Sequence, residues 1–295
     1  MKRLVCAFVA VLVLQVARAE TPLVLQSDFG TRDAAVAAMK GVAVGVSASL
    51  PIYDVTHEIP PYNIWEASLR LVQAAEYWPE GTVFVSVVDP GVGTERKSVV
   101  MRSRSGHFFV TPDNGTLTFI AEELGVDEVR EIDEAVNRLA NSEESYTFHG
   151  RDVYAFTGAR LAAGVIGFEQ VGRKLPTRVL SIPYQKAVLE DGTLRGNIPI
   201  LDVQYGNVWT NIGRETFAKL GVEPGGTVDV RIRNGDEEVY EGTVPYHPTF
   251  GYVEVGEPLL YLNSLNNVSL AINQGDFAEE HNIQSGASWN IEIEK

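Results

Sequence analysis

Cysteine is nearly absent from this sequence: the chain has 295 residues and a single cysteine, Cys6. A disulfide framework and a metal site made of cysteines are therefore excluded. Basic residues are also scarce, because 24 Lys and Arg stand against 39 Asp and Glu, a formal net charge of −15 at pH 7. A chain this acidic repels phosphate backbones and anionic membranes, so we expect neither nucleic acid nor lipid surfaces among its partners. A small cationic substrate is not penalised in this way.

The start of the chain has the pattern of a secretory signal peptide, with expected cleavage before Glu20. The pattern consists of basic residues, an apolar run and small residues near the cut: Lys2, Arg3, Leu4–Leu14, Ala17 and Ala19. A membrane anchor is less favoured, because the apolar run is too short to span a bilayer comfortably. Cleavage removes Cys6 and three basic residues, which changes the net charge from −15 to −18. We therefore expect an exported protein, periplasmic or secreted, that has no thiol and no membrane association after cleavage.

Alternating strand-like and helix-like segments fill the first half of the chain. This alternation is typical of a parallel sheet flanked by helices, in which functional sites lie beyond the carboxyl ends of the strands. We therefore predict an α/β domain with a mainly parallel sheet over residues 20–185. In chain order, the segments on which this rests are 21–27, 32–46, 51–55, 63–77 and 82–88.

The second half is dominated by short strand-like runs. A stretch punctuated by Pro and Gly, residues 174–197, separates it from the first half. The runs that follow are closely spaced, with turns such as Asn234-Gly235 and a single helix candidate at 214–220. Such a pattern is typical of a β-barrel or a β-sandwich. We therefore predict a second, β-barrel-like domain over residues 186–295.

The stretch VVDPGVGTER, residues 87–96, joins a strand-like run to a glycine turn with several charges. A dinucleotide loop needs a third glycine where Arg96 stands, and a Walker loop needs Gly-Lys-Ser/Thr, so a phosphate-binding loop is disfavoured. Two interpretations stay open on these residues alone. The stretch is either a plain surface turn or a tight turn that brings Asp89 and Arg96 together.

A second polar turn, TFHGRDVYAF at residues 147–156, precedes an apolar run with helical character. His149 in such a turn can act as a base, a proton relay or an orienting hydrogen-bond partner. The alternative is that Asp152 caps the helix while His149 lies on the surface. Further along, LDVQYGNVWTNIG at 201–213 sets amides beside aromatic rings, which suits a flat heterocycle, although such rings in a β-domain are more often core.

The acidic residues and histidines also allow a two-metal phosphoesterase. No H-x-H or H-E-x-x-H spacing ties them into a ligand set, so this interpretation is unspecific. The residues concerned are Asp28, Asp54, His57, Asp89, Asp113, His149 and Asp152.

Six motifs in order, DFG, DVTHEIPP, VVDPGVGTER, PDNG, TFHGRD and YGNVWTNI, cover nearly the whole chain after the signal segment. This set resembles the S-adenosylmethionine hydroxide adenosyltransferase family, which is related to the halide-using fluorinase and chlorinase. The resemblance implies hydrolysis of S-adenosyl-L-methionine to adenosine and L-methionine, by attack of water or hydroxide on the ribose C5′. It also implies a homotrimer with active sites between subunits, and neither a metal nor another cofactor.

The resemblance implies catalytic roles for Asp89, Arg96 and His149. The halogenases carry Tyr in place of Asp89 and a Tyr-Ser pair in place of His149-Gly150, so the hydrolytic branch is favoured. Substrate-binding roles are implied for seven residues that would contact the ribose, the reacting centre, the adenine and the methionine: Asp28, Tyr62, Phe148, Asp202, Tyr205, Asn207 and Ser264.

Some features differ from the family pattern. Leu265 stands where the fluorinase has Arg, and Ala35 stands where it has a methionine-binding Ser. The family is usually cytosolic, whereas this chain carries an export signal, so either the substrate reaches the periplasm or a related exported adenosyl compound replaces it. Two other functions stay open: a periplasmic protein that binds adenosine or an adenosyl compound without turnover, and a metal-dependent phosphoesterase.

Overall fold

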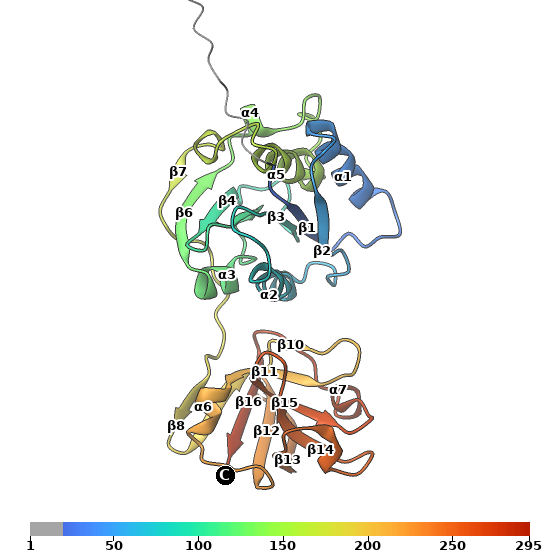
Figure 1. Ribbon diagram of the computed structural model, residues 1–295, viewed down its shortest axis with the longest axis vertical. Helices are drawn as coiled ribbons and strands as arrows, with labels where there is room; N and C mark the ends of the chain where they lie inside the picture. The colour runs from blue at the N-terminus through green and yellow to red at the C-terminus, as the bar shows by residue number, and fades with distance from the viewer. Residues whose placement is uncertain (1–19) are drawn as a thin grey trace, which may run out of the picture.

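The computed structural model describes residues 20–295, which form two lobes joined by an extended segment (Figure 1). The predicted signal peptide, including Cys6, lies outside the described residues. Among residues 20–295, no helix combines the length and the apolar character that crossing a membrane requires. The segment 176–187 between the lobes contains neither helix nor strand, and the predicted domain boundary at 185/186 falls within it.

A seven-stranded sheet forms the centre of the N-terminal lobe, in the order β2-β1-β3-β5-β4-β6-β7. The pairs β1–β2, β1–β3 and β3–β5 are parallel, and the pairs β4–β5, β4–β6 and β6–β7 are antiparallel. The strands are β1 (Leu23–Ser27), β2 (Ile52–Thr56), β3 (Val83–Val87), β4 (Ser98–Ser103), β5 (Phe108–Pro112), β6 (Val126–Glu131) and β7 (Lys174–Leu175).

The sheet is therefore mixed, and the prediction of a mainly parallel sheet is correct only for its first strands. The change of direction occurs because β4 and β5 are joined by a short hairpin, in which Ser103 N donates to His107 O at 2.9 Å. Gly106 takes the left-handed conformation that this turn requires, with φ of 81°. A connection this short can join only antiparallel strands.

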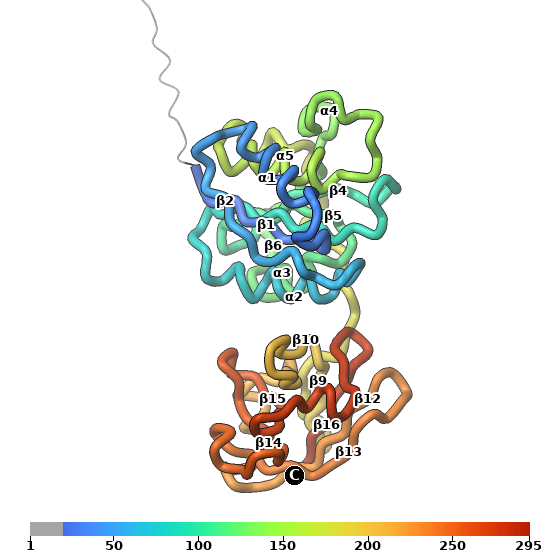
Figure 2. The backbone as a smooth tube through the Cα atoms, turned by 90° about the vertical axis from the view of Figure 1, so that its right-hand side faces the viewer, coloured from blue at the N-terminus to red at the C-terminus, as the bar shows by residue number. Residues whose placement is uncertain are grey.

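Helices cover both faces of this sheet. Alternate residues of each strand point to opposite faces, so one strand contributes to the apolar core on each side. Leu23 and Leu25 of β1 belong to the core under α1 and α5, whereas Val24 belongs to the core under α2 and α3. Figures 1 and 2 show α2 and α3 on the side that faces the C-terminal lobe. The helices are α1 (Ala35–Val46), α2 (Ile64–Ala75), α3 (Thr118–Glu123), α4 (Glu134–Asn137), α5 (Phe156–Ala162), a π-helix (Gly150–Ala155) and a 3-10 helix (Phe168–Gln170).

The C-terminal lobe consists of two antiparallel sheets, β10-β11-β15-β14 and β13-β12-β16-β9-β8, around one apolar core. The predicted β-rich character is confirmed, but the pairings among the described strands do not close a barrel, so the barrel-like form is not confirmed. Its elements are β8 (Val188–Glu190), β9 (Thr193–Asn197), β10 (Ile200–Leu201), β11 (Val208–Gly213), α6 (Arg214–Ala218), β12 (Thr227–Asn234), β13 (Glu237–Pro245), a 3-10 helix (Phe250–Tyr252), β14 (Pro258–Leu262), β15 (Asn267–Ile272), α7 (Phe277–Glu280) and β16 (Trp289–Glu294).

The two lobes touch through α2 and the start of the C-terminal sheets. Trp65 Nε1 donates to Pro199 O at 2.8 Å, and Ile200 belongs to the same apolar cluster as Trp65. Tyr184, from the connecting segment, packs edge-on against Trp65 with ring centroids 5.2 Å apart. The contact therefore joins one helix, the connecting segment and strand β10.

Candidate active site

The candidate active site lies at the carboxyl ends of the two neighbouring parallel strands β1 and β3. Ser27 pairs with Val87 at the end of the ladder, so the residues that follow, Asp28 and Asp89, leave the sheet at the same edge. Both line a pocket with a volume of about 230 Å³. This is smaller than the roughly 300–1,000 Å³ typical of small-molecule sites.

Asp89 and Arg96 form an ion pair with two parallel hydrogen bonds. Arg96 Nε donates to Asp89 Oδ1 at 2.9 Å and Arg96 Nη2 donates to Oδ2 at 2.6 Å, with side chains only 11% and 5% exposed, respectively. The turn between them is stabilised by Thr94, whose N–H and hydroxyl both donate to Gly91 O. Gly93 has a φ of 77°, and a Cβ there would lie 2.9 Å from Tyr146 O. The glycines thus serve a tight turn that returns Arg96 to Asp89.

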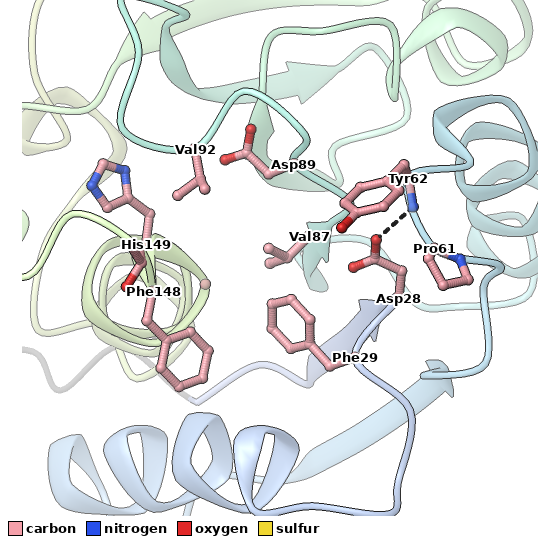
Figure 3. A pocket seen from close by; sticks show the side chains of 11 residues that line it. Asp28, Phe29, Pro61, Tyr62, Val87, Asp89, Val92, Phe148 and His149 are labelled. Carbon is pink, nitrogen blue, oxygen red and sulfur yellow. Dashed lines mark hydrogen bonds between the residues drawn. The ribbon is translucent and has the colours of Figure 1, made fainter.

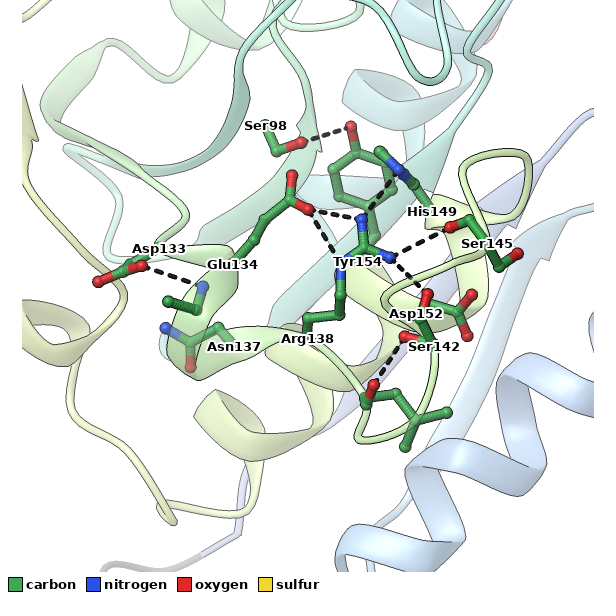
Figure 4. Close-up of polar contacts among 12 residues, drawn as sticks. Ser98, Asp133, Glu134, Asn137, Arg138, Ser142, Ser145, His149, Asp152 and Tyr154 are labelled. Carbon is green, nitrogen blue, oxygen red and sulfur yellow. Dashed lines mark hydrogen bonds and ion pairs between the residues drawn. The ribbon is translucent and has the colours of Figure 1, made fainter.

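His149 lies between two guanidinium groups. Its Nδ1 is 3.1 Å from Arg96 Nη2, and its Nε2 is 3.0 Å from Arg138 Nη2 (Figure 4 shows the second contact). Burial lowers the pKa of His149 below its ordinary value; Arg96 and Arg138 act in the same direction, against the carboxylate of Glu134. The site therefore favours a neutral imidazole, and the alternative of a surface histidine is wrong.

Two further side chains, Ser98 and Tyr154, form a chain of hydrogen bonds to Arg96. Arg96 Nη1 donates to Ser98 Oγ at 2.9 Å, and Ser98 Oγ is 3.1 Å from the hydroxyl of Tyr154. Burial raises the pKa of Tyr154 above its ordinary value, so its phenol stays protonated. Neither residue is among those predicted from the sequence, although Ser98 follows Arg96 by two positions and Tyr154 lies inside the TFHGRDVYAF stretch.

The opposite wall of the pocket contains Asp28 and Tyr62, which Figure 3 shows across from His149. The backbone N–H of Tyr62 donates to Asp28 Oδ2 at 2.9 Å. Tyr62 has a φ of 68°, an unusual conformation for a residue with a side chain, and its ring is exposed beside the pocket. This contact fixes the Asp28 carboxylate at the pocket rim.

Two aromatic rings close the floor of the pocket. Phe29 and Phe148 pack edge to face with centroids 5.6 Å apart, and Arg151 lies 4.8 Å above the Phe148 ring. The π-helix begins at Gly150, immediately after His149. A Cβ at Gly150 would lie 2.9 Å from the Phe29 ring, so glycine allows the helix to start against this floor.

The substrate-binding residues predicted in the C-terminal lobe do not line this pocket. Asp202, Tyr205 and Asn207 share the loop between β10 and β11, where Asn207 Nδ2 donates to Asp202 Oδ2 at 3.2 Å. Tyr205 is exposed. Within one chain, the structure therefore divides the predicted residues into an N-terminal pocket and a separate C-terminal loop.

Ser264 lies at the other end of the same sheet. It follows β14, and the neighbouring Asn267 pairs with Gly213 at the end of β11, whereas Asn207 precedes the start of β11. Strand β11 has six residues, about 20 Å of extended chain. Ser264 and Asp202 therefore lie at opposite ends of strand β11, and their predicted roles in holding the methionine stay predictions.

The residues that suggested a two-metal site lie in separate contacts. His57 Nε2 is 3.1 Å from Asp54, Asp113 accepts from the N–H of Leu180, and the remaining acidic residues pair with arginines or line the pocket. Within residues 20–295, His, Cys, Asp and Glu nowhere form a group of three or more that could hold a metal ion. The described side chains thus do not favour the phosphoesterase.

Sequence comparison gives the family. The model of the SAM hydroxide adenosyltransferase N-terminal domain matches residues 23–172, and that of the C-terminal domain matches residues 196–290. The chain belongs to the SAM hydroxide adenosyltransferase family. The resemblance carried by the six motifs is thereby confirmed.

Family relatives carry two different names. A protein named fluorinase from Actinopolyspora mzabensis is 32% identical, with 91% of this chain and 96% of that protein covered. A protein named (R)-S-adenosyl-L-methionine hydrolase from Methanocaldococcus jannaschii is also 32% identical, with 92% of each covered. A crystal structure of an uncharacterized conserved protein from Thermotoga maritima has a TM-score of 0.81 at 37% identity, covering 92% of this chain and 100% of that one. Overall identity thus does not separate hydrolysis from halogenation for this family member.

Proposed function

We propose that the protein hydrolyses S-adenosyl-L-methionine to adenosine and L-methionine. The observation that carries this proposal is the Asp89–Arg96–His149 cluster on one side of a pocket whose other side presents the carboxylate of Asp28. In the proposed step, the oxygen of a water molecule bonds to the ribose C5′ while the C5′–S bond breaks. The electron pair of that bond passes to sulfur, and the water gives up one proton.

The chemistry requires an oriented water and a proton acceptor. The sulfonium is already a good leaving group, so no acid is needed for methionine to depart. Each Asp89 oxygen accepts one bond from Arg96 and keeps a further lone pair for water. Both ring nitrogens of His149 already face guanidinium groups. We therefore assign the proton-accepting role to Asp89, with Arg96 holding the carboxylate in place and His149 holding Arg96.

The remaining pocket residues suit an adenosyl ligand. The Asp28 carboxylate, fixed by the N–H of Tyr62, can accept hydrogen bonds from both ribose hydroxyls. The rings of Phe29 and Phe148 limit the access of bulk water to the reacting carbon. A net charge of −15 favours a ligand that carries a sulfonium and an ammonium group.

Hydrolysis is favoured over halogenation by the charge of the cluster. A carboxylate at Asp89, only 5% exposed, would repel a halide ion held next to it, whereas it attracts the hydrogen of a water molecule. The halogenases carry Tyr at this position. Addition of fluoride or chloride to the reaction is therefore expected to give adenosine and no 5′-halogenated nucleoside.

We also propose a homotrimer in which a neighbouring subunit completes each site. The pocket of one chain is small, and the Asp202–Asn207 loop of the same chain does not reach it. An Asp89→Ala variant and an Asp202→Ala variant should each be inactive, yet activity should return when the two are unfolded and refolded together. Light scattering should give three times the mass of one chain; a monomer with full activity would refute the arrangement.

The reaction can be tested with purified protein. Incubation with the separated sulfonium epimers of S-adenosylmethionine, with and without EDTA, is followed by chromatography for adenosine and methionine, and Asp89→Asn serves as the control. Equal amounts of both products, unaffected by EDTA, are expected. Binding without adenosine would favour the binding protein, and activity lost with EDTA would favour the metal-dependent enzyme.

We propose further that the protein is exported, on the basis of the pattern at residues 1–19. Mass spectrometry of the protein purified from its own cells should give an N-terminus at Glu20. Recovery of the intact chain from the cytoplasm would contradict this proposal.

A further inference from the structure

Arg138 contacts the catalytic histidine on the side away from Asp89, and no sequence motif pointed to it. Its Nη2 lies 3.0 Å from His149 Nε2 and also donates to Glu134 Oε2 at 2.6 Å. Its Nε donates to the same carboxylate oxygen at 3.1 Å. Glu134 and Arg138 are four residues apart, a spacing that lets them meet on one helical turn. The Glu134 carboxylate thus holds the Arg138 guanidinium in place beside His149.

Every nitrogen of the Arg138 side chain has a partner. Nη1 lies 3.2 Å from Ser142 O and 3.3 Å from Ser145 O, two carbonyls of the loop that leads to His149 (Figure 4). The side chain is 9% exposed. A planar guanidinium with its donors used in this way has little freedom to move. Its position therefore determines where the imidazole of His149 lies.

The two arginines restrict the protonation of the ring. A neutral imidazole has one nitrogen that accepts and one that donates, whereas an imidazolium has two donors. In the imidazolium, both N–H groups would point at guanidinium donors, Arg96 on one side and Arg138 on the other. The arrangement disfavours that form through both charge and hydrogen bonding.

We propose that Arg138, held by Glu134, is a positioning residue that keeps the His149 imidazole neutral and fixed in orientation beside the Asp89–Arg96 pair. The catalytic significance of this arrangement rests on the proposed hydrolysis. A neutral, fixed ring can hold Arg96 where it pairs with Asp89, while a cationic ring would repel that arginine. The position of the ring itself does not depend on which reaction the site performs.

The test measures the protonation of His149 directly. The sequence has only five histidines, so protein labelled with ¹³C at histidine Cε1 gives few signals, and the His149→Asn variant identifies the relevant one. The charged groups that face this ring are Asp89, Arg96, Glu134 and Arg138. Arg138→Gln removes a facing cation and should raise the pH at which His149 titrates. Glu134→Gln removes a facing anion and should lower it.

Arg160→Gln is the matched control. Arg160 donates to Val136 O at 2.8 Å and to Asn137 Oδ1 at 2.7 Å, so it supports the same helix without contacting His149. This variant should leave the titration unchanged. If Arg138→Gln fails to fold, Arg138→Lys takes its place. This variant keeps the positive charge but loses the planar guanidinium, and its His149 should titrate as in the wild type.

The activity of the same variants completes the test. Arg138→Gln should lower kcat about 100-fold with little change in KM, because the ring is misplaced while the substrate contacts stay. Opposite titration shifts for Arg138→Gln and Glu134→Gln support the positioning role even if no S-adenosylmethionine is turned over, a result that would refute only the proposed function. Unchanged titration in Arg138→Gln, or equal shifts in the Arg160→Gln control, would overturn the inference.

Discussion

Replacing Gly150 with alanine tests how closely the pocket floor packs against the residue after His149. A Cβ at this position would lie 2.9 and 3.0 Å from two atoms of the Phe29 ring and 3.2 Å from Val87 Cγ1. Carbon atoms in ordinary contact are about 3.5–4.0 Å apart. The Phe29 ring must therefore move by about 0.5–1 Å, and because it packs against Phe148, the movement alters the pocket.

The size of the effect follows from two opposing contributions. Overpacking of this kind costs about 1–3 kcal/mol, and replacing glycine by alanine within a helix recovers about 1 kcal/mol. The net expectation is a loss of about 1 kcal/mol in the free energy of unfolding. Gly41 is the matched control, since it lies inside α1 with no atom within 4 Å of a Cβ. Gly41→Ala should gain about 1 kcal/mol.

Thermal unfolding of the two variants provides the assay. For a chain of this size, 1 kcal/mol corresponds to about 2–4 °C. Gly150→Ala should unfold about 2–4 °C below the wild type and Gly41→Ala about 2–4 °C above it. Gly150→Ala should also raise KM for S-adenosylmethionine, and Gly150→Ser should do so more strongly. Equal stabilisation by both alanines, with KM unchanged, would refute the packing argument.

Three further predictions concern the charged cluster and the contact between the lobes. Asp89→Asn removes the charge that Arg96 binds, so kcat should fall about 10²–10⁴-fold and denaturant unfolding should show a loss of about 1.5–3 kcal/mol; near-normal kcat would exclude Asp89 as the proton acceptor. Because the pKa of His149 is lowered, the unfolded chain takes up a proton that the native state does not as the pH falls below 6.5. Stability should therefore decline below that pH, whereas activity should decline only at the lower pH at which native His149 itself takes up a proton. His149→Gln should reduce the slope in the stability measurement; a slope unchanged by this substitution would contradict the assignment. Trp65→Phe removes the bond to Pro199 O, so hydrogen exchange should accelerate in α2 and β10; unchanged protection there would contradict a role for this contact in joining the lobes.

Local sequence pattern predicts the early elements of the fold well. The segment 63–77 contains α2, whose start is fixed by Asn63, the side chain of which accepts from Glu66 N at 2.9 Å. The direction of the later strands was not predictable in the same way. It depends on the hairpin between β4 and β5, where the turn signal at Gly106 is short and neither strand alternates regularly between apolar and polar residues.

Some contacts of the candidate site can likewise be predicted from the sequence, and others cannot. Asp89 and Arg96 share one turn, so their meeting can be inferred from the glycines between them. His149 comes from a segment 53 residues further on, and only the family resemblance placed it with Arg96. Arg138 was missed because it contacts His149 across a loop without a motif. The position of Ser264 depends on the pairing of β11 with β15, which no local pattern determines.

The proposed reaction is the attack of water, activated beside Asp89, on the C5′ of S-adenosylmethionine. Its most direct test is the reaction in water enriched in ¹⁸O, followed by mass spectrometry of the nucleoside product. Hydrolysis at C5′ should give adenosine with one ¹⁸O at the 5′ position, together with unlabelled L-methionine. Adenosine without the label, or a halogenated or thioether nucleoside as the product, would contradict it.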